Sequence, residues 1–102
     1  MLRYTFHNNK ETKHILLIYD IHNDIRRRKL AKLLESYGER IQESAFEFHI
    51  TAAQYNQLSQ KINTIMNESE DNIRIYMLHP DQVIIQKGIS IQTLSDCDLL
   101  IC

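Results

Sequence analysis

The sequence has few of the residues that mark several common kinds of functional site. Its 102 residues include two glycines and one proline, and no Walker-type glycine loop or dinucleotide-binding fingerprint is present. The two cysteines, Cys97 and Cys102, make neither a disulfide framework nor a four-ligand zinc site, so we expect ordinary reduced thiols. The sequence also contains no Ser-His-Asp or Cys-His order of the kind that would indicate an enzyme with a nucleophilic side chain.

Long hydrophobic runs are also absent. The longest uninterrupted apolar run extends from Ile15 to Tyr19, far short of the roughly 20 residues that cross a bilayer. No signal-peptide pattern precedes it, so we expect a cytoplasmic protein with no membrane partner. The chain is 43% apolar and 25% charged, which is typical of a globular protein, and its length indicates one domain.

The charge of the chain is balanced overall but unevenly distributed. The formal net charge is -1, yet six of the twelve Lys and Arg residues lie between positions 26 and 40, opposed there only by Glu35 and Glu39. These six bases are Arg26, Arg27, Arg28, Lys29, Lys32 and Arg40. Such clustering indicates a local anion site and argues against a protein coated in positive charge.

Hydrophobic periodicity predicts alternating strands and helices. Segment 14–20 is a short β-rich apolar run typical of a buried strand. Apolar residues with helical spacing follow, with N-cap candidates at Asn23 and Asp24 and a left-handed cap expected at Gly38. A capping box of Thr51 and Gln54 begins a second helix, which ends at the polar stretch NESEDN. The predicted elements are strand 14–20, helix 24–37, strand 41–50, a helix after Thr51, and strands 73–78 and 83–86.

This order of elements predicts an α+β fold. Two helices would cover one face of an antiparallel sheet, and ferredoxin-like sandwich is the best single description. A separate short strand at Ile41 and Gln42 remains an open alternative. The closing DLLIC is a further apolar run, which we expect to form a C-terminal strand.

Helical phase divides the basic cluster. At 100° per residue, Arg26 and Arg27 lie toward the sheet, whereas Arg28 and Lys32 lie on the opposite side of the predicted helix. Burying an unpaired ion costs several kcal/mol, so we expect Arg26 and Arg27 to reach the sheet rim beside Asp20. Two interpretations stay open: a salt-bridge set with Asp20 and neighbouring acids, or a phosphate held by arginine side chains and helix N–H groups.

Asp20 is the candidate for metal chemistry. At the end of a buried strand, it either caps the next helix or pairs with Arg27, or it holds Mg²⁺ for phosphodiester chemistry. A single Asp provides few ligands for such a metal site. A two-fold axis beside Asp20 would supply the same carboxylate from a second protomer. His22 is either a surface histidine or a proton shuttle. The other histidines (His7, His14, His49 and His79) show no ligand spacing.

Residues 19–48, YDIHNDIRRRKLAKLLESYGERIQESAFEF, closely resemble the signature of the small CRISPR-associated adaptation protein. This family provides the non-integrase partner of the spacer-acquisition pair. The shared pattern is a Tyr-Asp-Ile strand end, an Asp before a basic helix start, a Tyr-Gly helix end, then Arg-Ile-Gln, Ser and Phe-Glu. The matching residues are Tyr19, Asp20, Ile21, Asp24, Arg27, Tyr37, Gly38, Arg40, Ile41, Gln42, Ser44, Phe46 and Glu47. Later elements also fit in pattern, so the resemblance covers about residues 14–87.

The resemblance implies a ferredoxin-like homodimer in which two Asp20 side chains face each other and hold one Mg²⁺. It also implies a metal-dependent endonuclease acting on RNA or duplex DNA, and a scaffold gripped by a CRISPR-associated integrase. Asp20 would then be both the catalytic residue and the metal ligand. Arg27, Arg40 and Phe46 match positions treated as functionally important in the family. By the same resemblance, we expect the C-terminal DLLIC strand to add to the other protomer's sheet.

The expected nucleic-acid-binding residues are Arg27, Arg28, Lys29, Lys32 and Arg40, with Tyr19 and Phe46 in support. Two departures from the family pattern lie nearby, because Lys29 replaces an Arg found in some members and Ala45 replaces the usual Val. Residues 1–13 precede the position where the family begins, so we divide the chain into an extension at 1–13 and one ferredoxin-like domain at 14–102. Two alternatives to a nuclease remain: a non-catalytic nucleic-acid-binding scaffold and a toxin-like ribonuclease. RNA and duplex DNA are not distinguished as substrates.

Overall fold

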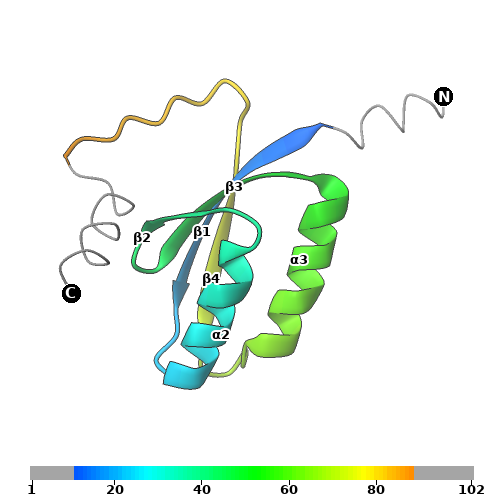
Figure 1. Ribbon diagram of the computed structural model, residues 1–102, viewed down its shortest axis with the longest axis vertical. Helices are drawn as coiled ribbons and strands as arrows, with labels where there is room; N and C mark the ends of the chain where they lie inside the picture. The colour runs from blue at the N-terminus through cyan, green and yellow to red at the C-terminus, as the bar shows by residue number, and fades with distance from the viewer. Residues whose placement is uncertain (1–10, 89–102) are drawn as a thin grey trace.

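A computed structural model describes residues 11–88 of the chain. Four strands and two helices occur in the order β1 (Thr12–Asp20), α2 (Asp24–Glu35), β2 (Glu39–Gln42), β3 (Ala45–Thr51), α3 (Ala52–Ile65) and β4 (Asn72–Leu78). The strands form one sheet in the order β2-β3-β1-β4, and every neighbouring pair is antiparallel. Figure 1 shows the two helices side by side across the sheet. This arrangement confirms the predicted α+β, ferredoxin-like fold.

The core lies between the sheet and the two helices. Alternate side chains of β1 and β3 point into it because successive residues of a strand face opposite sides of the sheet. The strands contribute Ile15, Leu17, Tyr19, Phe46, Phe48 and Ile50, and the helices contribute Leu30, Ala31, Leu34, Leu58 and Ile62. In the β1–β3 register, Ile15 lies opposite Phe48 and Leu17 opposite Phe46. These apolar pairs fix which residues of β1 face away from the helices.

The side of the sheet away from the helices, here called the open face, has no covering layer in residues 11–88. It carries His14, Leu16, Ile18 and Asp20 from β1, Glu47 and His49 from β3, and Arg74 and Tyr76 from β4. Ile18 and Tyr76 are exposed there. No helix within residues 11–88 is long and apolar enough to span a membrane.

The predicted strand 41–50 is two strands. β2 and β3 are separated by a turn, and their pairing shifts register between Arg40 and Gln42. The separate short strand at Ile41 and Gln42, which was an open alternative in the sequence analysis, therefore exists as β2 and begins at Glu39. β1 begins at Thr12, two residues before the expected position.

The predicted role of Gly38 is wrong. Helix α2 ends at Glu35, and its C-cap, Ser36, has right-handed φ/ψ values. Within residues 11–88 the glycine with positive φ is Gly88. A Cβ at Gly38 would lie 2.3 Å from the carbonyl oxygen of Glu47 and 2.4 Å from Cδ1 of Phe48, so glycine allows the chain after α2 to pass close to β3.

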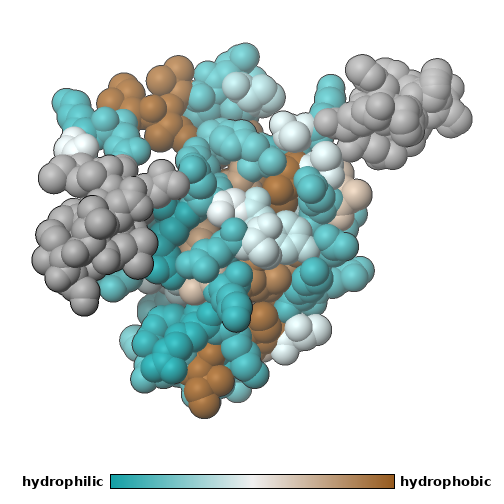
Figure 2. Space-filling model, in the orientation of Figure 1, coloured by the Kyte–Doolittle hydropathy of each residue, from teal (hydrophilic) through white to brown (hydrophobic). Residues whose placement is uncertain are grey.

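The predicted strand 83–86 is also wrong within the described chain. After β4 the chain turns at Pro80 and Asp81 and has no strand assignment up to Gly88. The segment 82–86 lines a cavity with Leu16 and Glu47 of the open face and with Ile41, Gln42 and Leu78. Val83 and Ile85 are nevertheless each 78% exposed. Figure 2 shows apolar side chains gathered on this segment. The expected DLLIC strand lies outside the described residues.

Candidate nucleic-acid interface

Three arginines converge on one cavity beside the start of α2. The cavity measures about 390 Å³ and lies between α2, the end of β1 and the β2–β3 turn. Its lining residues are Tyr19, Arg27, Arg28, Ala31, Arg40, Glu43 and Ser44. Cationic side chains from α2 and β2, which lie apart in the sequence, thus face one hollow that is large enough for a phosphate group. We call it the arginine cavity.

Local structure places the α2 arginines. The side chain of Asn23 accepts a hydrogen bond from the backbone N–H of Arg26 at 2.9 Å and caps the helix, which confirms one of the predicted N-caps. Arg27 then donates to Oδ1 of Asp24 at 2.6 Å and to the backbone oxygen of Ile21 at 3.3 Å. The Arg27 guanidinium holds the pKa of the Asp24 carboxyl below its usual value. Arg27 is therefore fixed at the cavity rim.

Within residues 11–88, Arg40 places an unpartnered hydrogen-bond donor in the cavity wall. Its guanidinium carbon lies 5.2 Å from the ring centroid of Phe46, a distance typical of a cation–π contact. Its Nε atom is buried and has no hydrogen-bond partner among residues 11–88. A buried unpaired donor is costly, so a rotation of the Arg40 guanidinium that lets this N–H donate to an anion in the cavity would lower the free energy of the protein.

The predicted supporting residues form part of the wall. The Tyr19 hydroxyl donates to the backbone oxygen of Glu43 at 3.2 Å, and the Tyr19 N–H donates to the backbone oxygen of Ser44 at 3.0 Å. These bonds attach the β2–β3 turn to the end of β1. The Tyr19 and Phe46 rings stack with their centroids 6.3 Å apart. Both rings hold the turn and Arg40 in place from the core side.

Arg26 does not pair with Asp20, contrary to expectation. Its Nε donates to Oδ2 of Asp71 at 2.8 Å and its Nη2 to Oδ1 at 3.1 Å. Nη2 also donates to Glu70 at 2.8 Å. Bonding to Arg26, and then to the backbone N–H of Asn67, lowers the pKa of Asp71. Arg26 therefore connects α2 to the loop before β4 and is a structural residue.

Asp20 lies on the other side of β1 from the arginine cavity. Tyr19 faces the core and the cavity, so strand alternation points Asp20 to the open face. The Asp20 side chain is 73% exposed, and Nε2 of His22 lies 3.3 Å from its Oδ1. The expectation that Arg27 belongs with Asp20 is thus wrong, because Arg27 shares its cavity with Arg28 and Arg40.

The two predicted lysines lie outside the cavity lining. Lys29 and Lys32 are both exposed on α2, and Arg28 is exposed at the cavity. The basic cluster therefore divides into three parts: Arg26, which is paired with Asp71 and Glu70; the arginine cavity; and two exposed lysines. Helical phase assigned Arg28 to solvent correctly, but its separation of Arg28 from Arg27 is wrong, because both line the arginine cavity together with Arg40 of β2.

One cluster was missed in the sequence. His14, Glu47 and His49 lie together on the open face, with one ligand atom from each within 4.8 Å of the others. The linear spacing of the histidines gives no signal, because His14 and His49 become neighbours only through β1–β3 pairing. Placing the outward residues of 14–20 and 45–50 on two antiparallel strands could have revealed it.

An exposed carboxylate at Asp20 suits Mg²⁺ as a ligand. Mg²⁺ takes one or two carboxylates and keeps several waters, and the solvent around Asp20 leaves room for them. His22 offers a softer nitrogen that Mg²⁺ does not prefer. One protomer therefore provides one good Mg²⁺ ligand at this position.

Comparisons with known proteins all identify the same protein family. Residues 13–83 match the family model described as CRISPR associated protein Cas2. CRISPR-associated endoribonuclease Cas2 1 from Chloroflexus aurantiacus is 50% identical over 64 residues, which are 62% of this chain and 69% of that protein.

Two solved structures are also similar. The fold resembles Streptococcus pyogenes Cas2, with 33% identity, a TM-score of 0.62, and coverage of 67% of this chain and 88% of that one. A chain of a partial Cas6-RT-Cas1–Cas2 complex is 44% identical with a TM-score of 0.60, covering 68% of this chain and 76% of that one. On the family match, the fold and these relatives, the chain belongs to the CRISPR associated protein Cas2 family.

Proposed function

We propose that this protein acts in CRISPR adaptation as a dimeric, metal-dependent endonuclease and as a scaffold of the spacer-integration complex. The observation that carries the proposal is the convergence of Arg27, Arg28 and Arg40 on one cavity in a chain of this family. Its relative from Chloroflexus aurantiacus is named an endoribonuclease, and a similar chain is part of a complex with Cas1. The substrate would be RNA or duplex DNA in the cytoplasm, and the partner would be the integrase.

The arginine cavity would bind a backbone phosphate. Guanidinium groups bind phosphate oxygens through paired N–H donors, and the buried Nε of Arg40 is a donor without a partner among residues 11–88. Exposed Arg28, Lys29 and Lys32 on α2 would extend the contact to further phosphates. Such contacts hold a nucleic acid in register without reading its sequence.

Homodimer formation through the open face would complete the metal site. Ile18 and Tyr76 are exposed on this face, and Val83, Ile84 and Ile85 are exposed beside it. The extended segment 82–86 carries backbone groups with no strand partner in residues 11–88, and such groups favour pairing with another strand. A two-fold axis through the open face would bring two Asp20 carboxylates together.

The catalytic roles follow from this dimer. When bound, Mg²⁺ supplies a polarised water and stabilises charge on a phosphate. Asp20 from each protomer would hold the ion, and His22, at 3.3 Å from Asp20, would accept or donate a proton at Nε2. Because the arginine cavity lies on the other side of β1, its arginines would bind flanking phosphates and not the scissile one.

A non-catalytic scaffold is the second candidate. The observation that favours it is the separation of Asp20 from the arginine cavity, since binding by the arginines does not require the carboxylate. Cleavage by Asp20→Asn distinguishes the two. An endonuclease loses cleavage in this variant and in the presence of a chelator while it keeps nucleic-acid binding. If the wild-type protein binds but never cleaves RNA or duplex DNA with Mg²⁺ present, the scaffold is correct.

A further inference from the structure

We propose that His14, Glu47 and His49 form a second metal site, suited to Zn²⁺ or a similar transition-metal ion, on the open face. The three residues come from the two central strands, β1 and β3. They are separate from the arginine cavity, and the inference does not depend on the proposed nuclease activity.

Strand pairing builds the cluster. His14 lies directly opposite His49 in the antiparallel register, and Glu47 precedes His49 by two residues on β3. Residues two apart in a strand share a face, and the buried Ile15 and Phe48 fix that face as the one away from the core. All three side chains therefore project from the same side of the sheet.

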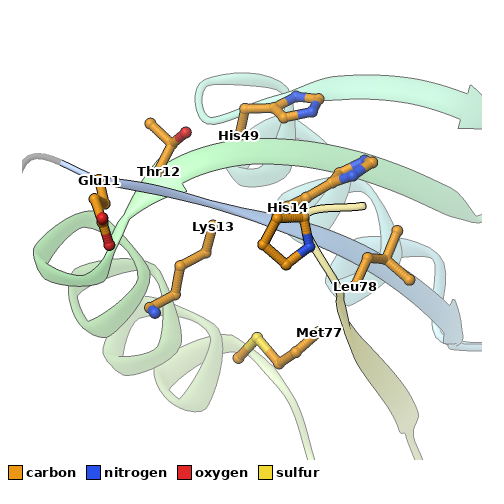
Figure 3. A pocket seen from close by; sticks show the side chains of 8 residues that line it. Glu11, Thr12, Lys13, His14, His49, Met77 and Leu78 are labelled. Atoms are coloured by element: carbon orange, nitrogen blue, oxygen red, sulfur yellow. The ribbon is translucent and has the colours of Figure 1, made fainter. Parts of the chain in front are cut away.

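The donor atoms are already close. The His14 and His49 rings stack with centroids 4.2 Å apart and an interplanar angle of 20°, and Figure 3 shows them on the same side of the sheet. Nε2 of His14 lies 2.5 Å from Oε2 of Glu47. Ligands of a tetrahedral Zn²⁺ stand roughly 3.3 Å apart, given Zn–N and Zn–O lengths near 2.0–2.2 Å. Small side-chain rotations on fixed strands would bring the three donors to that separation.

The donor set selects the ion. Two imidazoles and one carboxylate are a ligand set of zinc sites that keep a fourth position open for water. Imidazole favours Zn²⁺, Cu²⁺ and Ni²⁺, whereas Mg²⁺ prefers oxygen ligands. In the protomer the His49 side chain is exposed, and its ring has no hydrogen-bond partner among residues 11–88, so the ring is free to bind an ion. In the protomer the cluster also borders a cavity of about 560 Å³, which gives an ion access. Since the proposed dimer also uses the open face, this metal site requires that the dimer leave this end of β1 uncovered.

This site is distinct from the one at Asp20. His14 and Asp20 are six positions apart on β1, which corresponds to about 20 Å along an extended strand. Loss of Asp20 should therefore leave this site intact. The two sites also take different kinds of ion, so a protein prepared with Zn²⁺ and Mg²⁺ together would hold both.

Titration of the metal-free full-length protein with Zn²⁺ alone tests the proposal. Isothermal calorimetry should give one Zn²⁺ per protomer, and Co²⁺ should give the absorption of a tetrahedral site. His14→Ala and His49→Ala should each weaken Zn²⁺ binding at least tenfold. In the wild type, free Zn²⁺ at 100-fold above its Kd should raise the melting temperature by about 10 °C or more.

Two control variants make the test specific. His79→Ala removes an exposed histidine that lies 3.8 Å from Asp81 and outside the cluster, and Asp20→Asn removes the proposed Mg²⁺ ligand; both should keep wild-type Zn²⁺ affinity. Circular dichroism establishes that each variant is folded. Because His49 is exposed, His49→Ala should disturb the fold less than His14→Ala. The proposal is overturned if the wild type binds no Zn²⁺, if folded His49→Ala binds it equally well, or if His79→Ala abolishes binding.

Discussion

Replacing Arg40 by alanine should weaken nucleic-acid binding while the fold is retained. The guanidinium lies at the arginine cavity, 5.2 Å from the Phe46 ring centroid, and its buried Nε has no hydrogen-bond partner among residues 11–88. The variant therefore removes a hydrogen-bond donor that residues 11–88 leave without a partner. In the free protein the variant loses the cation–π contact, about 0.5–1 kcal/mol, and the packing of a half-buried side chain.

The expected loss on binding is larger. A hydrogen bond to a charged group contributes about 1.5–3 kcal/mol, which corresponds to a roughly 10- to 150-fold increase in Kd. Losing one phosphate contact should also reduce the slope of log K against log salt concentration by about 1. Both changes should be similar for different sequences, because phosphate contacts carry no sequence information.

Fluorescence anisotropy with labelled duplex DNA and RNA, over a range of salt concentrations, measures both quantities. Lys61→Ala is the matched control, since Nζ of Lys61 lies 5.4 Å from the Tyr37 ring centroid and outside the arginine cavity. It removes a cation and a ring contact of the same kind but should leave Kd and slope unchanged. Equal effects of Arg40→Ala and Lys61→Ala would refute a specific role for the cavity.

Three further predictions concern stability and assembly. Gly38→Ala would place a Cβ 2.4 Å from Cδ1 of Phe48 and should destabilise the fold by about 1–3 kcal/mol in urea unfolding; an unchanged midpoint would contradict this packing. Because the folded-state pKa of Asp71 is lowered by Arg26, its stabilisation is present above the unfolded-state pKa of about 3.9 and is lost as pH falls through the folded-state value. In the Asp71→Asn variant the free energy of unfolding should therefore fall less steeply as the pH is lowered. An unaltered pH profile would show that the Arg26–Asp71 pair does not cause the loss of stability in acid. Ile84→Asp, at an exposed apolar position, should convert the proposed dimer to a monomer in light scattering, whereas a persistent dimer would place the interface elsewhere.

Local patterns predicted most of the fold. The capping box of Thr51 and Gln54 is present with both hydrogen bonds, and Asn23 caps α2. The alternation of Phe46, Phe48 and Ile50 identified the buried face of β3. These features depend on neighbours within a few residues, which the sequence displays directly.

Features that depend on distant segments were predicted poorly. Gly38 is explained by the approach of β3 to the end of α2, and helix geometry alone suggested a cap. Arg26 pairs with Asp71, 45 positions away, so local charge could not identify its partner. For the same reason, the histidine cluster became visible only with the β1–β3 register, and the arginine cavity only with the placement of Arg40 on β2.

Cleavage of RNA and duplex DNA by wild-type protein and by Asp20→Asn, with Mg²⁺ and then with excess chelator, tests the proposed function most directly. The Asp20 carboxylate is exposed on the open face and outside the arginine cavity, so the variant should fold and bind as the wild type does. We predict that wild-type protein cleaves with Mg²⁺ and that the chelator and the substitution each abolish cleavage. Undiminished cleavage by Asp20→Asn at equal binding would contradict a metal-dependent site at Asp20.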